Sequence, residues 1–364
     1  MNKLKKILDY DQSIWLDFLD REVMESGELK KFIEEDGVRG LTSNPAIFEK
    51  AISNSSDYDD DIVKFAEKED DNEAIFFDLA IKDIQRAADI FKPVYDKTNG
   101  KDGFVSLEVA PGLARDTDGT IKQAKELWKK VDRKNLMVKI PGTAEGLPAI
   151  RECISAGINI NVTLLFGLPG YKKVTEAYIQ GLEDRVKAGK SIDQVASVAS
   201  FFLSRIDVMV DPLLKDKGGD DLVGEVAIAS AKRAYAIYKE VFYSDRFKKL
   251  EKEGAKRQRV LWASTSTKDP SFRDVKYVEA LIGKDTVNTV PTDTLEAFRD
   301  HGKAEDNLEK GMDKAKQTLE RLSELGINID KITQDLEDEG IDKFVKPFDK
   351  LLQGIEDQKK KLKA

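Results

Sequence analysis

The stretch NLMVKIPGTAEGLPAIRECISAGININVTLLF, residues 135–166, contains two apolar runs separated by a helical pattern. The runs, 135–140 and 158–165, are rich in the branched residues that favour strands. Between them, residues 146–156 carry apolar side chains at helical spacing. Both runs are mostly apolar rather than alternating, as is typical of parallel strands that helices cover on both faces. The stretch therefore predicts a strand–helix–strand unit with parallel strands.

The same alternation extends along the chain in both directions. The predicted strands span 13–17, 37–42, 103–109, 135–140, 158–165, 195–202, 259–264 and 285–290. The predicted helices between them include 73–91, 120–131, 146–156, 170–188 and 224–240. Strand–helix repetition of this extent predicts a closed (β/α)8 TIM barrel of the α/β class. An open doubly wound sheet is the main rival, but the chain has neither a GxGxxG turn nor a P-loop.

Residues 292–364 differ from the rest of the chain. They contain no strand-like run, and their apolar residues fall on helical faces. We expect this segment to form the last barrel helix and additional C-terminal helices packed on the barrel. No low-complexity linker interrupts the chain, so residues 1–364 are predicted to form a single domain.

Composition excludes several classes of function. Charged residues make up 35% of the 364 residues, yet the net charge is only −8 and the two signs are interspersed, so no nucleic-acid partner is expected. No apolar run approaches the ~18 residues of a membrane span, and no signal peptide is recognisable, so we expect a cytoplasmic protein that does not bind membranes. One cysteine, Cys153, and one histidine, His301, argue against a disulfide, a thiolate zinc site or a catalytic triad, and no metal is expected. Charge-rich helices are compatible with both a monomer and a homodimer.

The sharpest single observation is Lys139, which lies inside the apolar strand Leu136–Pro141. In a (β/α)8 barrel, chemistry occurs where strands end at the carboxyl face. A charged amine is costly to bury, and a neutral amine can attack a carbonyl to form a Schiff base. The alternative is a structural lysine that is paired with a buried carboxylate.

Two carboxylates, Asp17 and Glu108, end strands that are equally apolar. Schiff-base chemistry needs a proton shuttle for carbinolamine dehydration and a base for the hydroxyl whose deprotonation breaks a carbon–carbon bond. Two acids fit these two tasks. The alternative, in which either carboxylate merely neutralises Lys139, is weaker for both together than for each alone.

Arg205 and Lys268 follow the sixth and seventh predicted strands. An arginine offers a bidentate fork to a phosphate, and a lysine offers a point charge. The alternative for each is a surface ion pair.

Six segments carry a resemblance to a known family. They are 13–17 with Asp17, GLTSNPAIF at 40–48, 105–109 with Glu108, 137–141 with Lys139, GININVTLLF at 157–166, and VASFFLSRID at 198–207. In this order they resemble the motifs of the transaldolases, in their longer bacterial subgroup, and the resemblance spans nearly the whole chain.

The resemblance implies transfer of a dihydroxyacetone unit through a lysine Schiff base, in the non-oxidative pentose phosphate pathway. The donor would be sedoheptulose 7-phosphate or fructose 6-phosphate, and the acceptor glyceraldehyde 3-phosphate or erythrose 4-phosphate. Lys139 would form the imine with the donor, and Asp17 would take the proton of the C4 hydroxyl as the C3–C4 bond breaks. Glu108 would exchange protons with a bound water that Thr163 positions. No cofactor is implied, because the protonated imine is the electron sink.

The resemblance also implies a set of substrate-binding residues. Asn44 and Asn161 would bind hydroxyls of the dihydroxyacetone unit, and Ser200 would do so more loosely. Arg205 and Ser264 would hold the phosphate. Phe202 lies where the family lines its site with a bulky side chain.

One departure from the family pattern concerns the phosphate. Many transaldolases carry a second arginine shortly after the seventh strand, and this position falls on Ser266. Our hypothesis is that Lys268 supplies the missing charge, and Arg273 is a weaker candidate.

Two other functions compete with this interpretation. A fructose 6-phosphate aldolase would use the same Schiff base but release dihydroxyacetone, and such enzymes are shorter chains. A non-catalytic sugar-phosphate-binding barrel would leave Lys139 as a spectator, against which the complete catalytic set argues.

Overall fold

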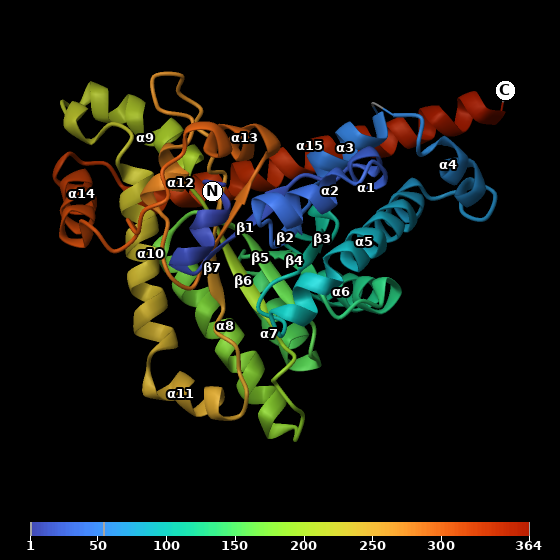
Figure 1. Ribbon diagram of the computed structural model, residues 1–364, viewed down its shortest axis with the longest axis horizontal. Coiled ribbons are helices and arrows are strands. Elements are labelled where there is room, and N and C mark those ends of the chain that lie inside the picture. Colours follow the sequence, from blue (N-terminus) through green and yellow to red (C-terminus); the bar gives the residue numbers. More distant parts are fainter. Residues whose placement is uncertain (1, 54, 364) are drawn as a thin grey trace.

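The computed structural model describes residues 2–53 and 55–363, which form a closed barrel of parallel strands surrounded by helices (Figure 1). The strands are β1 Gln12–Asp17, β2 Gly40–Thr42, β3 Val105–Glu108, β4 Leu136–Pro141, β5 Ile160–Leu165, β6 Ser197–Phe202, β7 Arg259–Ala263 and β8 Thr286–Val290. Pairing of β1 with β8, with Trp15 opposite Thr289, closes the barrel. The predicted (β/α)8 barrel with additional C-terminal helices is confirmed.

Several strands are shorter than predicted because the backbone turns within the predicted range. Gly37 and Gly103 adopt φ angles of 75° and 83°, so β2 and β3 begin only after them. Glycine suits these positions because its missing Cβ removes the steric penalty of positive φ. At Ser264 and Asp285, φ angles of 54° and 59° likewise end β7 and delay the start of β8.

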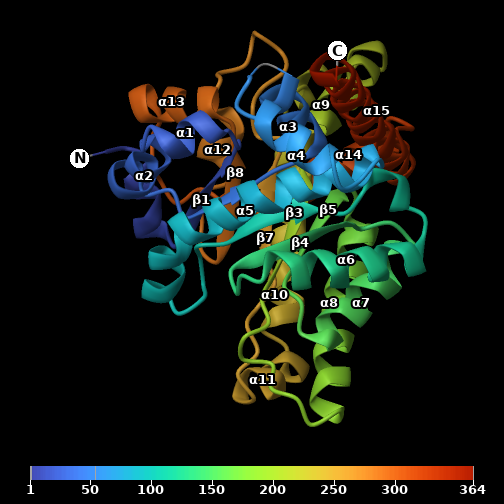
Figure 2. The same cartoon turned by 90° about the vertical axis from the view of Figure 1, so that its right-hand side faces the viewer.

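The helices lie outside the strands, and Figure 2 shows several of them around the sheet. The α-helices before β6 are α1 Arg21–Glu25, α2 Glu28–Lys31, α3 Pro45–Ser53, α4 Asp59–Ala66, α5 Asn72–Lys97, α6 Thr117–Val131, α7 Gly146–Ala156 and α8 Leu168–Lys187. Those after β6 are α9 Ser204–Asp216, α10 Val226–Phe242, α11 Asp245–Lys252, α12 Lys276–Ala280, α13 Thr292–His301, α14 Met312–Glu324 and α15 Ile329–Lys363. Short helical turns are η1 Lys5–Tyr10, η2 Phe32–Asp36, η3 Pro111–Leu113 and η4 Asp220–Leu222. Each predicted helix lies within an observed one or differs from it by a few residues.

The barrel interior is packed with side chains rather than open. The Trp15 ring is buried and lies against Gly40, where an added Cβ would come within 2.6 Å of the ring. Near the amino-terminal ends of the strands, buried Arg259 donates to Asp102 at 2.8 Å and to Ser13 at 2.9 Å. This buried ion pair fills part of the barrel interior at that end.

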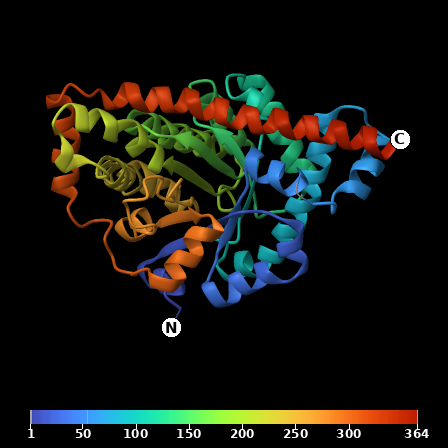
Figure 3. The same ribbon diagram turned by 90° about the horizontal axis from the view of Figure 1, so that it is seen from above.

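Residues 292–363 contain the helices α13, α14 and α15, joined by non-helical segments, and no strand, as the sequence predicts. The long helix α15 runs along one side of the molecule, past α9 at its start and past α3 and α4 further on (Figure 3). It also contacts the end of β5. In the described part of the chain, no helix combines the length and the apolar character that crossing a membrane requires.

Candidate active site

A cavity of about 290 Å³ opens at the carboxyl ends of the strands. All of the predicted site residues line it except Glu108 and Asn161. Those that line it are Asp17, Asn44, Lys139, Thr163, Ser200, Phe202, Arg205, Ser264 and Lys268. They come from six different strands or the segments that follow them, so the closed barrel brings together residues that are far apart in the sequence.

Lys139 lies on β4 with only 7% of its side chain exposed. Its Nζ is 3.1 Å from a carboxylate oxygen of Glu108 and donates to the carbonyl oxygen of Ser43 at 3.2 Å. The register of β3 and β4, which places Glu108 opposite Lys139, produces the ion pair. The buried carboxylate partner considered in the sequence is therefore present, but the amine of Lys139 also faces a cavity, which a purely structural pair does not need.

Glu108 is buried beside Lys139. Apart from that contact, its carboxylate oxygens have no hydrogen-bond partner among the described residues. Burial raises the pKa of Glu108, and the positive charge of Lys139 only partly opposes this effect. A raised pKa brings a carboxyl group closer to the pKa that suits general acid–base catalysis.

Asp17, the last residue of β1, lies on another side of the cavity. Its carboxylate accepts a hydrogen bond from Thr42 at 2.7 Å, and the hydroxyl of Thr42 is also 2.7 Å from that of Thr289. Burial raises the pKa of Asp17, while Lys139 and the hydrogen bond from Thr42 oppose the rise. Lys139 therefore has two carboxylates near it, and both resist ionisation.

Thr163, on β5, is fully buried, and its hydroxyl has no hydrogen-bond partner within 2–53 and 55–363. Polar groups in protein interiors are rarely left in this state. Thr163 lines the cavity, so this unsatisfied hydroxyl lies next to the site.

The two predicted asparagines differ in position. Asn44 caps α3 by accepting a hydrogen bond from the backbone N–H of Ile47 at 3.0 Å, and it lines the cavity. Asn161 is fully buried in β5, where it donates to Ser106 at 3.0 Å and accepts from Ser200 at 2.7 Å. Ser200 lines the cavity, so Asn161 reaches it through the hydroxyl of Ser200.

Arg205 and Lys268 lie on the same side of the cavity. Neither forms an ion pair with the described residues, and Lys268 donates to Ser266 at 3.0 Å. Burial and the charge of Arg205 lower the pKa of Lys268, and burial lowers the pKa of Arg205. Glu339 partly opposes the effect of burial on the pKa of Arg205, but neither cation has an ion-pair partner within the described residues, so the two form a favourable place for an anion such as phosphate.

Ser264 follows β7 with a φ of 54°, which is uncommon outside glycine. Its carbonyl accepts a hydrogen bond from the backbone N–H of Ser204 at 3.0 Å, and its hydroxyl is 2.8 Å from that of Ser204. These contacts hold the unusual conformation beside Arg205, which is the place where the anion would bind.

Some residues of the cavity were given no role in the site from the sequence. Lys343 and Phe344 of α15 line it, as do Thr42, Ser266 and Thr289. The threonines stand at strand ends, which is a usable signal. Phe344 was seen only as part of an apolar helical face, and such a face does not tell which part of the barrel it covers.

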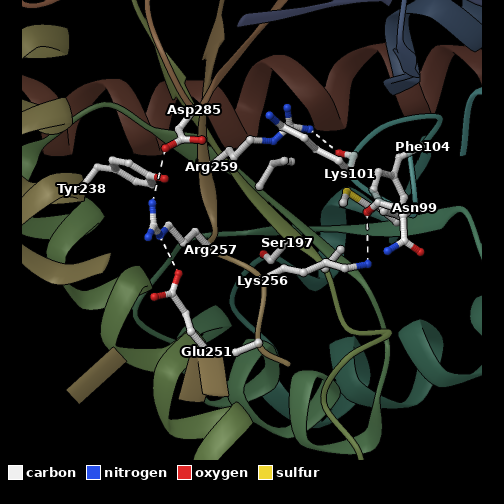
Figure 4. Close-up of a pocket in the computed structure, with 15 residues that line it drawn as sticks. Asn99, Lys101, Phe104, Ser197, Tyr238, Glu251, Lys256, Arg257, Arg259 and Asp285 are labelled. Carbon is white, nitrogen blue, oxygen red and sulfur yellow. Dashed lines mark hydrogen bonds and ion pairs between the residues drawn. The ribbon is translucent and has the colours of Figure 1, made fainter. Parts of the chain in front are cut away.

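A second cavity, of about 340 Å³, lies at the amino-terminal ends of the strands (Figure 4). It contains none of the predicted site residues. Its cations are mostly paired: Arg257 with Glu251 at 2.8 Å, and Arg259 with Asp102. The chemistry-bearing residues are therefore concentrated at the carboxyl end.

Comparison with known proteins agrees with this geometry. The sequence model of the family described as Transaldolase/Fructose-6-phosphate aldolase matches residues 14–355. The chain belongs to this family. A protein of Trichodesmium erythraeum named Transaldolase is 49% identical, over 99% of this chain and 98% of that protein. Transaldolase 2 of a Nostoc species is 48% identical over 100% and 99% of the two chains, and the Transaldolase of Saccharopolyspora erythraea is 46% identical over 98% of each.

The match to the transaldolase/fructose-6-phosphate aldolase family covers every strand of the barrel except the first two residues of β1. It also covers most of α15. The similarity therefore includes the residues on all sides of the cavity, Lys343 and Phe344 among them.

Proposed function

We propose that this chain is a transaldolase that transfers a dihydroxyacetone unit between sugar phosphates through a Schiff base on Lys139. The observation that carries the proposal is the buried amine of Lys139, 3.1 Å from Glu108, at the floor of a cavity that Asp17 and two unpaired cations also line. The names of relatives that align over nearly the full length support the same activity.

Imine formation comes first. Lys139 passes a proton to the adjacent carboxylate of Glu108, and its neutral amine then attacks the C2 carbonyl of the ketose; a proton moves from the nitrogen to the oxygen to give a carbinolamine. Loss of water from the carbinolamine requires a proton donor, and Glu108 with its raised pKa suits this role. The unpartnered hydroxyl of Thr163 would hold the water through which Glu108 acts.

Cleavage of the carbon–carbon bond follows. Asp17 takes the proton of the C4 hydroxyl, C4 becomes an aldehyde carbon, and the electron pair of the C3–C4 bond moves into the protonated imine. Counting carbons, fructose 6-phosphate leaves glyceraldehyde 3-phosphate, and sedoheptulose 7-phosphate leaves erythrose 4-phosphate. The three-carbon enamine stays on Lys139, and the reverse steps join it to the acceptor aldehyde. Neither an external oxidant nor a cofactor enters this sequence.

Substrate binding divides between two parts of the cavity. Asn44, Ser200 and, through Ser200, Asn161 would contact the hydroxyls of the dihydroxyacetone unit. Arg205, Ser264 and Lys268 would hold the phosphate. Phe202, whose ring centroid is 5.2 Å from that of Phe166, would supply an apolar wall. Such substrates belong to the non-oxidative pentose phosphate pathway, and we propose that the enzyme works in the cytoplasm.

Borohydride trapping tests the proposal. The protein is incubated with fructose 6-phosphate and reduced, and the adduct is mapped by peptide mass spectrometry. A three-carbon adduct on Lys139, absent from Lys139→Met, is expected. Lys268 and Lys343 also line the cavity and serve as internal controls for random modification. Absence of an adduct from the folded protein would contradict the proposal and favour a sugar-phosphate-binding barrel without catalysis.

A further inference from the structure

Helix α15 supplies one wall of the cavity through Lys343 and Phe344. The ring centroid of Phe344 lies 5.3 Å from the Nζ of Lys139, within the range of a cation–π contact. The ring is partly buried against the hydrophobic core. An aromatic side chain from outside the barrel therefore covers the nitrogen on which the proposed chemistry takes place.

Two close contacts fix the position of α15 over the barrel. An added Cβ on Gly340 would come within 3.0 Å of Leu164 and 3.4 Å of Phe166, so the helix lies directly on the end of β5. An added Cβ on Gly167 would come within 2.6 Å of the hydroxyl of Thr333. Phe344 follows Gly340 by four residues and so lies on the same face of the helix. The contact between Phe344 and Lys139 is thus a consequence of how α15 is seated.

We propose that Phe344 shields the enamine on Lys139 from water and so determines how much of it is transferred rather than hydrolysed. This inference rests on the proposed Schiff base. In transfer, C3 of the enamine forms a bond to the aldehyde carbon of the acceptor. In the competing reaction, C3 takes a proton from water, water adds to C2, and the C2–N bond breaks. One water is consumed, dihydroxyacetone leaves and the free amine of Lys139 is restored.

Both steps of the loss require water next to Lys139. The ring of Phe344 lies over the nitrogen, and the adjoining walls include the apolar side chain of Phe202. Exclusion of water by closing a site protects reactive intermediates from hydrolysis. The acceptor aldehyde reaches C3 from within the cavity, so a cover over the nitrogen does not block transfer.

The test compares two variants of one helix, Phe344→Ala and Phe348→Ala. Phe348 lies four residues further along α15 and packs its ring 5.4 Å from that of Phe76, and it does not line the cavity. Each protein is given fructose 6-phosphate and erythrose 4-phosphate, and dihydroxyacetone and sedoheptulose 7-phosphate are quantified together. We expect Phe344→Ala to raise the ratio of released dihydroxyacetone to transferred product by about tenfold or more, because water gains access to the enamine. Phe348→Ala is expected to leave the ratio unchanged.

The outcomes separate this inference from the proposed function. An unchanged ratio in Phe344→Ala, or an equal rise in Phe348→Ala, would overturn the shielding role. If Phe344→Ala does not fold, Phe344→Leu and Phe348→Leu replace the pair, and only the first is expected to raise the ratio. Borohydride trapping is repeated on each variant: an adduct on Lys139 is expected in all of them. Its absence from the unmodified protein would instead contradict the Schiff base itself.

Discussion

Replacement of Glu108 by glutamine distinguishes a catalytic carboxylate from a structural ion pair. Removal of one partner of a buried ion pair typically costs about 3–5 kcal/mol of the free energy of unfolding. Here burial raises the pKa of Glu108 despite the nearby Lys139, so its ionised form is less favourable in the folded than in the unfolded chain. Asp17 still faces Lys139 in the variant. We therefore expect Glu108→Gln to keep or slightly increase stability at neutral pH.

Activity should respond in the opposite way. Loss of a positioned acid–base group lowers kcat by about 10² to 10⁴, which corresponds to about 3–5 kcal/mol of transition-state stabilisation. Urea unfolding at pH 7 gives the stability, and a coupled assay of glyceraldehyde 3-phosphate release gives kcat. A loss of about 3–5 kcal/mol of stability, with unchanged kcat per folded molecule, would refute the catalytic assignment and leave Glu108 as a structural partner.

Three further predictions concern other parts of the molecule. Lys268→Ala should raise KM for fructose 6-phosphate about tenfold, because an ionic contact to phosphate is worth about 1.5 kcal/mol. It should leave KM for unphosphorylated fructose nearly unchanged. Equal changes in both KM values would contradict the assignment of Lys268 to the phosphate. Burial raises the pKa of Asp207 to about 6, so its ionisation between about pH 4 and pH 6 should lower the free energy of unfolding by up to about 3 kcal/mol. Urea titrations at pH 4.5 and 7 should show a smaller change in the free energy of unfolding for Asp207→Asn than for the unmodified protein. An equal change in the two proteins would contradict the prediction. Arg259→Ala removes the cation that pairs with the buried Asp102, which keeps its hydrogen bonds from Ser13 and Trp15. The change should cost about 3–5 kcal/mol of stability, with kcat per folded molecule unchanged. A change of less than about 1 kcal/mol by urea unfolding would count against the importance of this ion pair.

The strands could be predicted because each is a short apolar run between turn-forming segments. The errors lie at their ends, where local backbone geometry decides. Glycines such as Gly37 look neutral in a sequence, yet at a φ of 75° the backbone turns there and the strand begins only after it. For Ser264, the positive φ is held by contacts to Ser204, which is distant in the sequence, and no local pattern reports such contacts.

Most of the site was also predictable, since polar side chains at the ends of apolar strands must meet at one face of a barrel. The position of Lys139 in its strand and the family motifs indicated the same face. The wall made by α15 was not predictable in this way. Phe344 belongs to an apolar helical stripe. The stripe predicts that this face of the helix is buried, but it does not predict that the face covers Lys139. The position of α15 on the barrel depends on close contacts such as that of Gly340 with Leu164.

The cover of the cavity by α15 also has a consequence for the order in which the protein is synthesised. All of the strands, with Lys139, Glu108 and Asp17, leave the ribosome before Phe344 does. A barrel that closes during translation would hold a reactive lysine open to water and to other carbonyl compounds. In such a barrel, the ring of Phe344 would cover the amine of Lys139 only once α15 has packed on the strands made before it.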